Sequence, residues 1–155
     1  MNELKTQSET VCGWPLAVCS WSLRCDPDGV ARALSELDIR LVNLALKPAF
    51  AENGADYLAA VRRHAWTLSA ATIGFFHEDY TSLKSIRATG GIVPDAHWPR
   101  SREMVLRAID LTVDLGAPFL SLHAGFIEEE EGTSAQRVRD RLTLLADAAG
   151  EHGIG

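Results

Sequence analysis

The fold is decided by the stretch PFLSLHAG at residues 118–125. Short apolar runs without alternation are typical of strands that are buried on both faces. Helix-patterned segments precede and follow this run, which makes it a strand in a βα series. Parallel α/β folds place their chemistry at the C-terminal ends of the strands. We therefore predict that His123 lies at a functional edge, where its ring could bind metal or substrate. The alternative is a histidine that only hydrogen-bonds a neighbouring loop.

The strand–helix order occurs four times along the chain. Strands are predicted at 16–21, 39–46, 68–76 and 118–125, and helices are predicted to begin at Asp26-Pro27, Asn53-Gly54, Ser101 and Ser134. Each helix would let the next strand lie parallel to the one before. Residues 1–13 form a polar lead-in, and 14–155 form the folded part. Ile154 and Gly155 have the pattern of the first step of a fifth strand.

Two architectures fit this order. One is a doubly wound open sheet, and the other is the first half of a (βα)8 barrel. A complete barrel needs about 250 residues, so a chain of 155 residues would supply only half of one. A nucleotide-binding doubly wound domain usually has a glycine-rich turn after its first strand, and residues 22–25 contain no glycine.

Two connections are notable for length or charge. The first runs from His77 to about Arg100 and contains the turn signals Gly90-Gly91 and Pro94. Connections of this length are usually functional or mobile, and we interpret His97 within it as a surface residue. The second is the acidic run at 128–131, which predicts a solvated loop.

Composition narrows the classes of partner and compartment. The formal net charge is −6 and the sequence pI is about 5.3, which argues against nucleic acid and anionic membranes as partners. The polar start lacks the order of a signal peptide, and the apolar stretch at 11–19 is too short to span a bilayer. We therefore predict a cytoplasmic protein. Its three cysteines contain no CxxC pair and fit neither a disulfide framework nor a zinc ribbon.

Five segments, taken together, resemble the sugar phosphate isomerase/epimerase family, which are xylose-isomerase-like TIM barrels. The segments are CSWSL at 19–23, NLAL at 43–46, EDYTSL at 78–83, TGGIVPD at 89–95 and LHAGFI at 122–127. The resemblance runs from about residue 16 to the end of the sequence. It implies an α/β fold of parallel (βα) repeats of TIM-barrel type, with about four of the eight units present and the chain ending before the fifth strand.

The resemblance implies metal-assisted proton transfer next to a carbonyl of a small sugar or keto substrate. In the family a divalent metal, such as manganese, cobalt, magnesium or zinc, polarises the substrate oxygens, and carboxylates act as acid and base. Those carboxylates and most metal ligands lie on the fifth to eighth strands. We therefore expect the isolated chain to be inactive.

The resemblance also carries over to particular residues. His123 matches the histidine that closes the fourth strand, and it is a candidate for binding substrate and metal. Glu78 and Asp79 match the loop after the third strand, and Glu78 and the neighbouring His77 are further candidates for contact with the substrate. His77 lies roughly where the related endonuclease branch has a metal-binding histidine. Trp21 could form an apolar wall for a sugar ring, or could simply pack at the barrel mouth.

Two other readings compete with the isomerase. The chain could be a non-catalytic half barrel, whose unpaired first and fourth strands would favour self-association or pairing with a partner chain. It could also be an apurinic-site endonuclease-like zinc hydrolase. His77 and His123 allow that reading, whereas the negative net charge of the chain and the isomerase-like GGIVPD segment argue against it.

Overall fold

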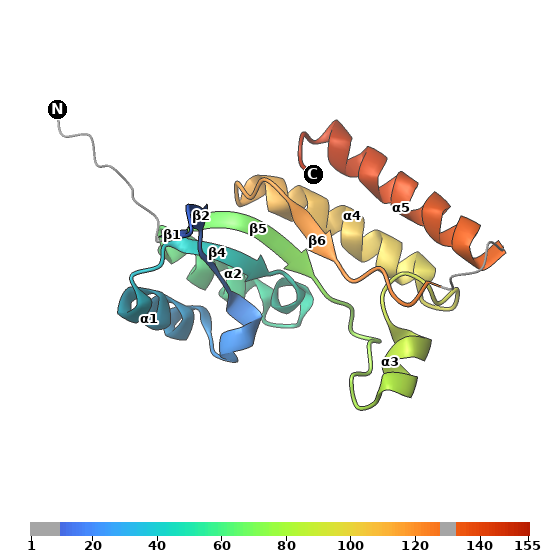
Figure 1. The fold of residues 1–155 in the computed structure, drawn as a ribbon, viewed down its shortest axis with the longest axis horizontal. Helices are drawn as coiled ribbons and strands as arrows, with labels where there is room; N and C mark the ends of the chain where they lie inside the picture. The colour runs from blue at the N-terminus through green and yellow to red at the C-terminus, as the bar shows by residue number, and fades with distance from the viewer. Residues whose placement is uncertain (1–9, 128–132) are drawn as a thin grey trace.

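The computed structural model describes residues 10–127 and 133–155. A parallel four-stranded sheet in the order β3-β4-β5-β6 forms its centre. The strands are β3 (Ala17–Cys19), β4 (Leu41–Ala45), β5 (Thr67–Ile73) and β6 (Leu120–Leu122). The crossover helices are α1 (Pro27–Leu37), α2 (Gly54–Arg63) and α4 (Trp98–Asp114), and α5 (Thr133–Glu151) follows β6 (Figure 1). This order confirms the predicted parallel (βα) repeats.

The two faces of the sheet differ in character. On one face Val42, Leu44 and Ile73 are fully buried against the helices and belong to the hydrophobic core. On the other face Thr72 Oγ1 donates to Asn43 Oδ1 at 2.9 Å and lies 2.6 Å from Ser121 Oγ, and these side chains are partly or fully exposed. A doubly wound sheet would carry helices on both faces. The one-sided burial therefore selects the half barrel.

The N-terminal part of the fold differs from the prediction. Strands β1 (Thr10–Val11) and β2 (Trp14–Pro15) pair antiparallel. The turn between them has Cys12 at φ 53° and Gly13 at φ 83°, as two-residue hairpin turns require. The loose lead-in predicted through residue 13 is therefore wrong for 10–13, and residues 1–9 lie outside the described part. Strand β3 ends at Cys19, because the short 3-10 helix η1 (Ser20–Leu23) follows at once.

The long connection after β5 is more ordered than predicted. It contains α3 (Leu83–Thr89), whose N-terminus carries a capping box between Ser82 and Ser85 (Figure 1). The next helix, α4, begins at Trp98 with His97 as its N-cap, so the predicted cap at Ser101 is wrong. Pro99 explains the earlier start, because proline suits the first turn of a helix. Ser101 lies instead inside that first turn and is buried.

The chain returns to the sheet after α5. Leu120 N–H donates to Gly155 O at 2.9 Å, and Gly155 N–H donates to Pro118 O at 3.1 Å. These bonds confirm the first step of a fifth strand. They also correct the prediction of a bare edge beside β6, because Gly155 already occupies its start. Strand β3 has no strand partner on its outer side within residues 10–127 and 133–155.

Three further expectations can be compared with the structure. The cysteines Cys12, Cys19 and Cys25 are all free thiols. No helix in the described ranges is long and apolar enough to cross a membrane. The acidic run at 128–131 lies outside the described residues.

Candidate functional site at the carboxyl ends of the strands

The carboxyl ends of the parallel strands meet at one edge of the sheet, from which the segment with α3 projects (Figure 1). Lys47 follows β4 in the short helix η2 (Lys47–Phe50). Its Nζ donates to Phe75 O at 2.9 Å and lies 5.2 Å from the centre of the exposed Phe76 ring. The ends of β4 and β5 are thus held together by one cation.

Glu78 organises the loop that follows β5. Its side chain is only 2% exposed. Oε2 accepts from Phe75 N–H at 2.9 Å, and Oε1 accepts from Gly91 N–H at 3.1 Å. A buried carboxylate needs such donors, because water no longer solvates its charge. Glu78 therefore ties the end of β5 to the glycine turn after α3.

His123 faces this carboxylate from the end of β6. Its Nδ1 lies 3.5 Å from Glu78 Oε1, which is longer than a well-formed hydrogen bond but within ion-pair range. Its side chain is 41% exposed, and the Phe126 ring meets the imidazole edge-on with 5.9 Å between centroids. A carboxylate beside one ring nitrogen favours the proton on that nitrogen. In the described residues Nε2 has no partner, so it is the atom available to a ligand.

The glycine turn brings these groups together by contact between backbones. Ile92 N–H donates to Ala124 O at 2.9 Å. Gly91 has φ +67°, and a Cβ there would lie 2.3 Å from the carbonyl carbon and oxygen of Ala124. Gly125 has φ +111°, and a Cβ there would lie 2.5 Å from Gly90 O. Only glycine fits such an approach. The sequence analysis missed this pairing; its signal was a glycine in each of the two segments.

His77 lies on the other side of the same turn. Its Nε2 is 3.2 Å from Gly91 O, and its ring stacks on His97 with 4.2 Å between centroids and on Phe75 with 5.4 Å. Burial lowers the pKa of His77, and its hydrogen bond to Gly91 opposes this effect. His97 is half-buried in this stack, so its interpretation as a surface residue is wrong.

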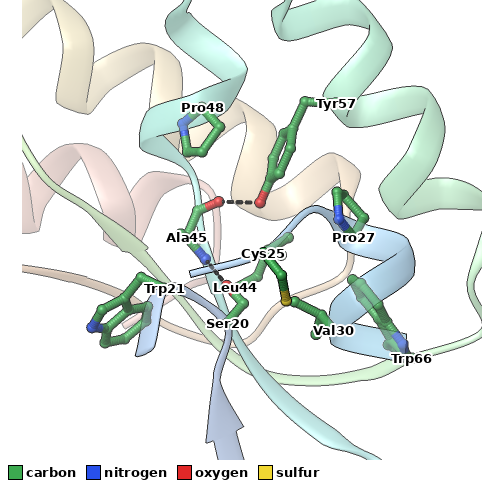
Figure 2. Close-up of a pocket in the computed structure, with 10 residues that line it drawn as sticks. All are labelled: Ser20, Trp21, Cys25, Pro27, Val30, Leu44, Ala45, Pro48, Tyr57 and Trp66. Carbon is green, nitrogen blue, oxygen red and sulfur yellow. Dashed lines mark hydrogen bonds between the residues drawn. The ribbon is translucent and has the colours of Figure 1, made fainter. Parts of the chain in front are cut away.

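Trp21 lies at the predicted edge of the sheet, but it lines a cavity that is separate from the pair of His123 and Glu78. It is the second residue of η1 and lines a cavity of about 90 Å³ between β4, α1 and α2 (Figure 2). Two hydrogen bonds lie in its wall: Tyr57 Oη donates to Ala45 O at 2.6 Å, and Ala45 N–H donates to Ser20 Oγ at 2.9 Å. Burial raises the pKa of Tyr57 to about 12. These polar groups are satisfied, so the cavity offers little to orient a ligand. Trp21 and His123 follow strands three positions apart, which is about 14 Å at 4.8 Å per strand.

The described residues do not assemble a metal site by themselves. Within 10–127 and 133–155, no three His, Cys, Asp or Glu side chains gather in one group. Both carboxylate oxygens of Glu78 already accept hydrogen bonds from backbone amides. Asp79 accepts hydrogen bonds from Thr81 in its own loop, and these bonds lower its pKa. Of these three side chains, only His123 remains as a possible metal ligand. This arrangement gives no support to a multi-zinc hydrolase in this part of the chain.

The geometry can now be compared with known proteins. No family model matches the sequence, and no curated protein matches it. A xylose isomerase domain protein from Planctomyces limnophilus superposes with a TM-score of 0.64 at 18% identity, covering 81% of this chain and 45% of that one. A xylose isomerase-like TIM barrel protein from Mycobacterium smegmatis, in complex with magnesium, superposes with a TM-score of 0.61 at 13% identity, covering 92% and 54%.

These superpositions confirm the predicted fold. The chain has the architecture of about half of the TIM barrel in these two structures, and it spans about half of their length. The four parallel strands in the described residues agree with that share, because a complete barrel has eight.

Proposed function

We propose that this chain provides the substrate-orienting first half of a sugar isomerase or epimerase site, which acts by proton transfer next to a carbonyl. The proposal is carried by the pair of His123 and Glu78 at the carboxyl edge of a half barrel. The fold shared with xylose isomerase-like proteins supports it. In this proposal His123 contacts the substrate, and Glu78 is a positioning residue.

The chemistry of the pair suits a polyhydroxy or keto substrate. When Nδ1 carries the only ring proton, Nε2 can accept a hydrogen bond from a sugar hydroxyl. When both nitrogens carry a proton, Nε2–H can instead donate to a carbonyl oxygen. Negative charge grows on that oxygen when the neighbouring proton is removed, so a fixed donor is most useful there. The exposed rings of Phe76 and Phe126 provide apolar surface for the C–H faces of a sugar.

A divalent cation belongs to the proposal only at the level of the family. One structural neighbour was crystallised with magnesium. This chain would contribute His123 at most, since the described residues hold no cluster of three ligands. Manganese, cobalt, magnesium or zinc would need ligands from outside the described part. We therefore assign no step to the metal and expect no turnover from the 155-residue chain.

The proposal predicts weak ketose binding at His123. Titrating the ¹⁵N-labelled chain with D-xylulose should shift the amide signals of 123–126 and Gly91, with a dissociation constant on the order of millimolar. The shifts should disappear in His123→Ala. In the control His152→Ala, which removes an exposed histidine at the end of α5, they should remain. Unchanged binding by His123→Ala would remove this histidine from the site.

We further propose self-association, because one observation favours it specifically. The outer side of β3 has no strand partner in the described ranges, and the open face of the sheet carries exposed polar side chains. Such an edge can pair with another chain. We commit to a second copy of this chain as the partner, because each of two copies would supply the same unpaired β3 edge.

Light scattering tests this proposal directly. We expect a particle of twice the 16.9 kDa chain mass. Ala17→Lys places a charge on the exposed edge strand and should shift the particle to a monomer. Ala55→Lys, at an exposed position of α2, should leave the dimer intact. A wild-type chain that stays monomeric at all concentrations and unfolds cooperatively would overturn the proposal.

A further inference from the structure

A second cavity lies between the end of β5 and the first two turns of α4. Its volume is about 160 Å³, and its walls include Phe75, Phe76, His77, His97 and Ser101. Both rings of the stacked pair His77 and His97 line it, and it is separate from the cavity beside Trp21. The isomerase proposal uses neither Ser101 nor the start of α4.

Ser101 is the unusual member of this wall. Its side chain is 1% exposed, and Oγ has no hydrogen-bond partner in the described part of the chain. A buried hydroxyl without a partner is destabilising, because it has given up its hydrogen bonds to water and received none in return. Serine near a helix start usually caps the helix or bonds a carbonyl one turn back, and Ser101 does neither. A ligand oxygen in the cavity would give this hydroxyl its missing partner.

The start of α4 also presents positive charge to the cavity. The helix has 17 residues and no acidic residue in its first turn. Trp98 N–H is bonded to Pro94 O, Ser101 N–H is bonded to His97 O, and Pro99 has no N–H. Within the described residues, Arg100 N–H therefore remains without a backbone acceptor. The free amide, the helix dipole and the Arg100 guanidinium all favour an anion here.

One carboxylate lies near the cavity but does not line it. Glu78 is close enough to act on His77, but its two oxygens accept from Phe75 N–H and Gly91 N–H. The aromatic rings of Phe75 and Phe76 bound the cavity on its apolar side. The space therefore suits a small anion with several acceptor oxygens and excludes a large ligand.

We propose that this cavity binds a phosphate group, with Ser101 Oγ, Arg100 and the free backbone amide of Arg100 as donors. The phosphate could be the free ion or part of a phosphorylated substrate. Its oxygens can accept from donors that approach from different sides. The inference does not depend on the proposed function, since it uses none of the contacts of His123.

Phosphate binding can be measured on the 155-residue chain itself. Inorganic phosphate should raise the melting temperature more than sodium chloride of equal ionic strength, and should shift the amide signals of Arg100 and Ser101. Ser101→Ala should fold normally, because it removes an unpaired hydroxyl. We expect it to weaken phosphate binding about 10-fold or more, as the loss of one hydrogen bond to a charged group implies. Arg100→Gln should weaken binding similarly.

Two comparisons sharpen the test. Arg102→Gln removes an exposed arginine from the same helix and should bind phosphate as the wild type does. D-Xylulose 5-phosphate distinguishes the sources: tighter binding than inorganic phosphate would assign the cavity to a substrate ester, and equal binding would assign it to the free ion. A phosphate response no larger than that of chloride, or one undiminished in both Ser101→Ala and Arg100→Gln, would overturn the proposal.

Discussion

Gly91→Ala should destabilise the chain by about 3 kcal/mol or more, a large share of the 5–15 kcal/mol that stabilises an ordinary domain. The residue has φ +67°, a conformation that costs alanine about 1–2 kcal/mol. Its new Cβ would also lie 2.3 Å from the carbonyl carbon and oxygen of Ala124. These are backbone atoms and cannot rotate away, so one of the two segments must move.

Movement of either segment would break more than one contact. The hydrogen bond from Ile92 N–H to Ala124 O and the bond from Gly91 N–H to Glu78 both depend on this approach. Glu78 would then lose one of its two donors while its side chain is buried. We expect the amide signals around His123 to shift in any folded fraction, because His123 Nδ1 faces the same carboxylate.

Urea unfolding with a matched glycine control measures the effect. Gly116 has φ +73°, but a Cβ there would meet nothing within 4 Å. Gly116→Ala should therefore cost only the backbone strain, about 1–2 kcal/mol. The excess loss in Gly91→Ala isolates the clash with Ala124, in the segment that follows β6. Equal losses for the two variants would show that the contact between the turn and Ala124 contributes nothing.

The sequence was sufficient for the architecture because the relevant signals are local. Apolar runs and helical stripes indicated the four βα units, and Asp26-Pro27 marked the start of α1, where Asp26 accepts from Gly29 N–H at 2.7 Å. The position of His123 at a strand end followed from the run before it. The pattern of strands and helices alone left two architectures open, and the resemblance implied the half barrel. The burial of only one face of the sheet confirms that choice.

The site was less predictable because its contacts join distant segments. Glu78 was placed in the correct loop, but its role as an acceptor for Phe75 and Gly91 requires the turn to reach back. Ser101 was misassigned as a cap, since a serine before a helical stripe is a normal helix start. The helix in fact begins three residues earlier, and only the folded chain shows that Ser101 is buried without a partner.

Arg141→Met is expected to cost about 2–4 kcal/mol, for a reason that differs from the glycine clash. The Arg141 side chain on α5 is 7% exposed. Its Nη1 donates to Ile92 O at 2.6 Å and to Val93 O at 2.8 Å, Nη2 pairs with Asp95, and its guanidinium carbon lies 4.8 Å from the Trp98 ring centre. Methionine retains much of the apolar stem but leaves two carbonyls without their donor.

A neighbouring arginine is the natural control for this substitution. Arg137 also pairs with Asp95, but its side chain is 43% exposed. Arg137→Met should therefore change the free energy of unfolding by less than about 1 kcal/mol. Hydrogen exchange should also quicken around 92–95 in Arg141→Met only, because this guanidinium holds that segment against α5. If both variants lost the same free energy, the ion pair with Asp95 would account for the anchoring, and the two carbonyl contacts would not.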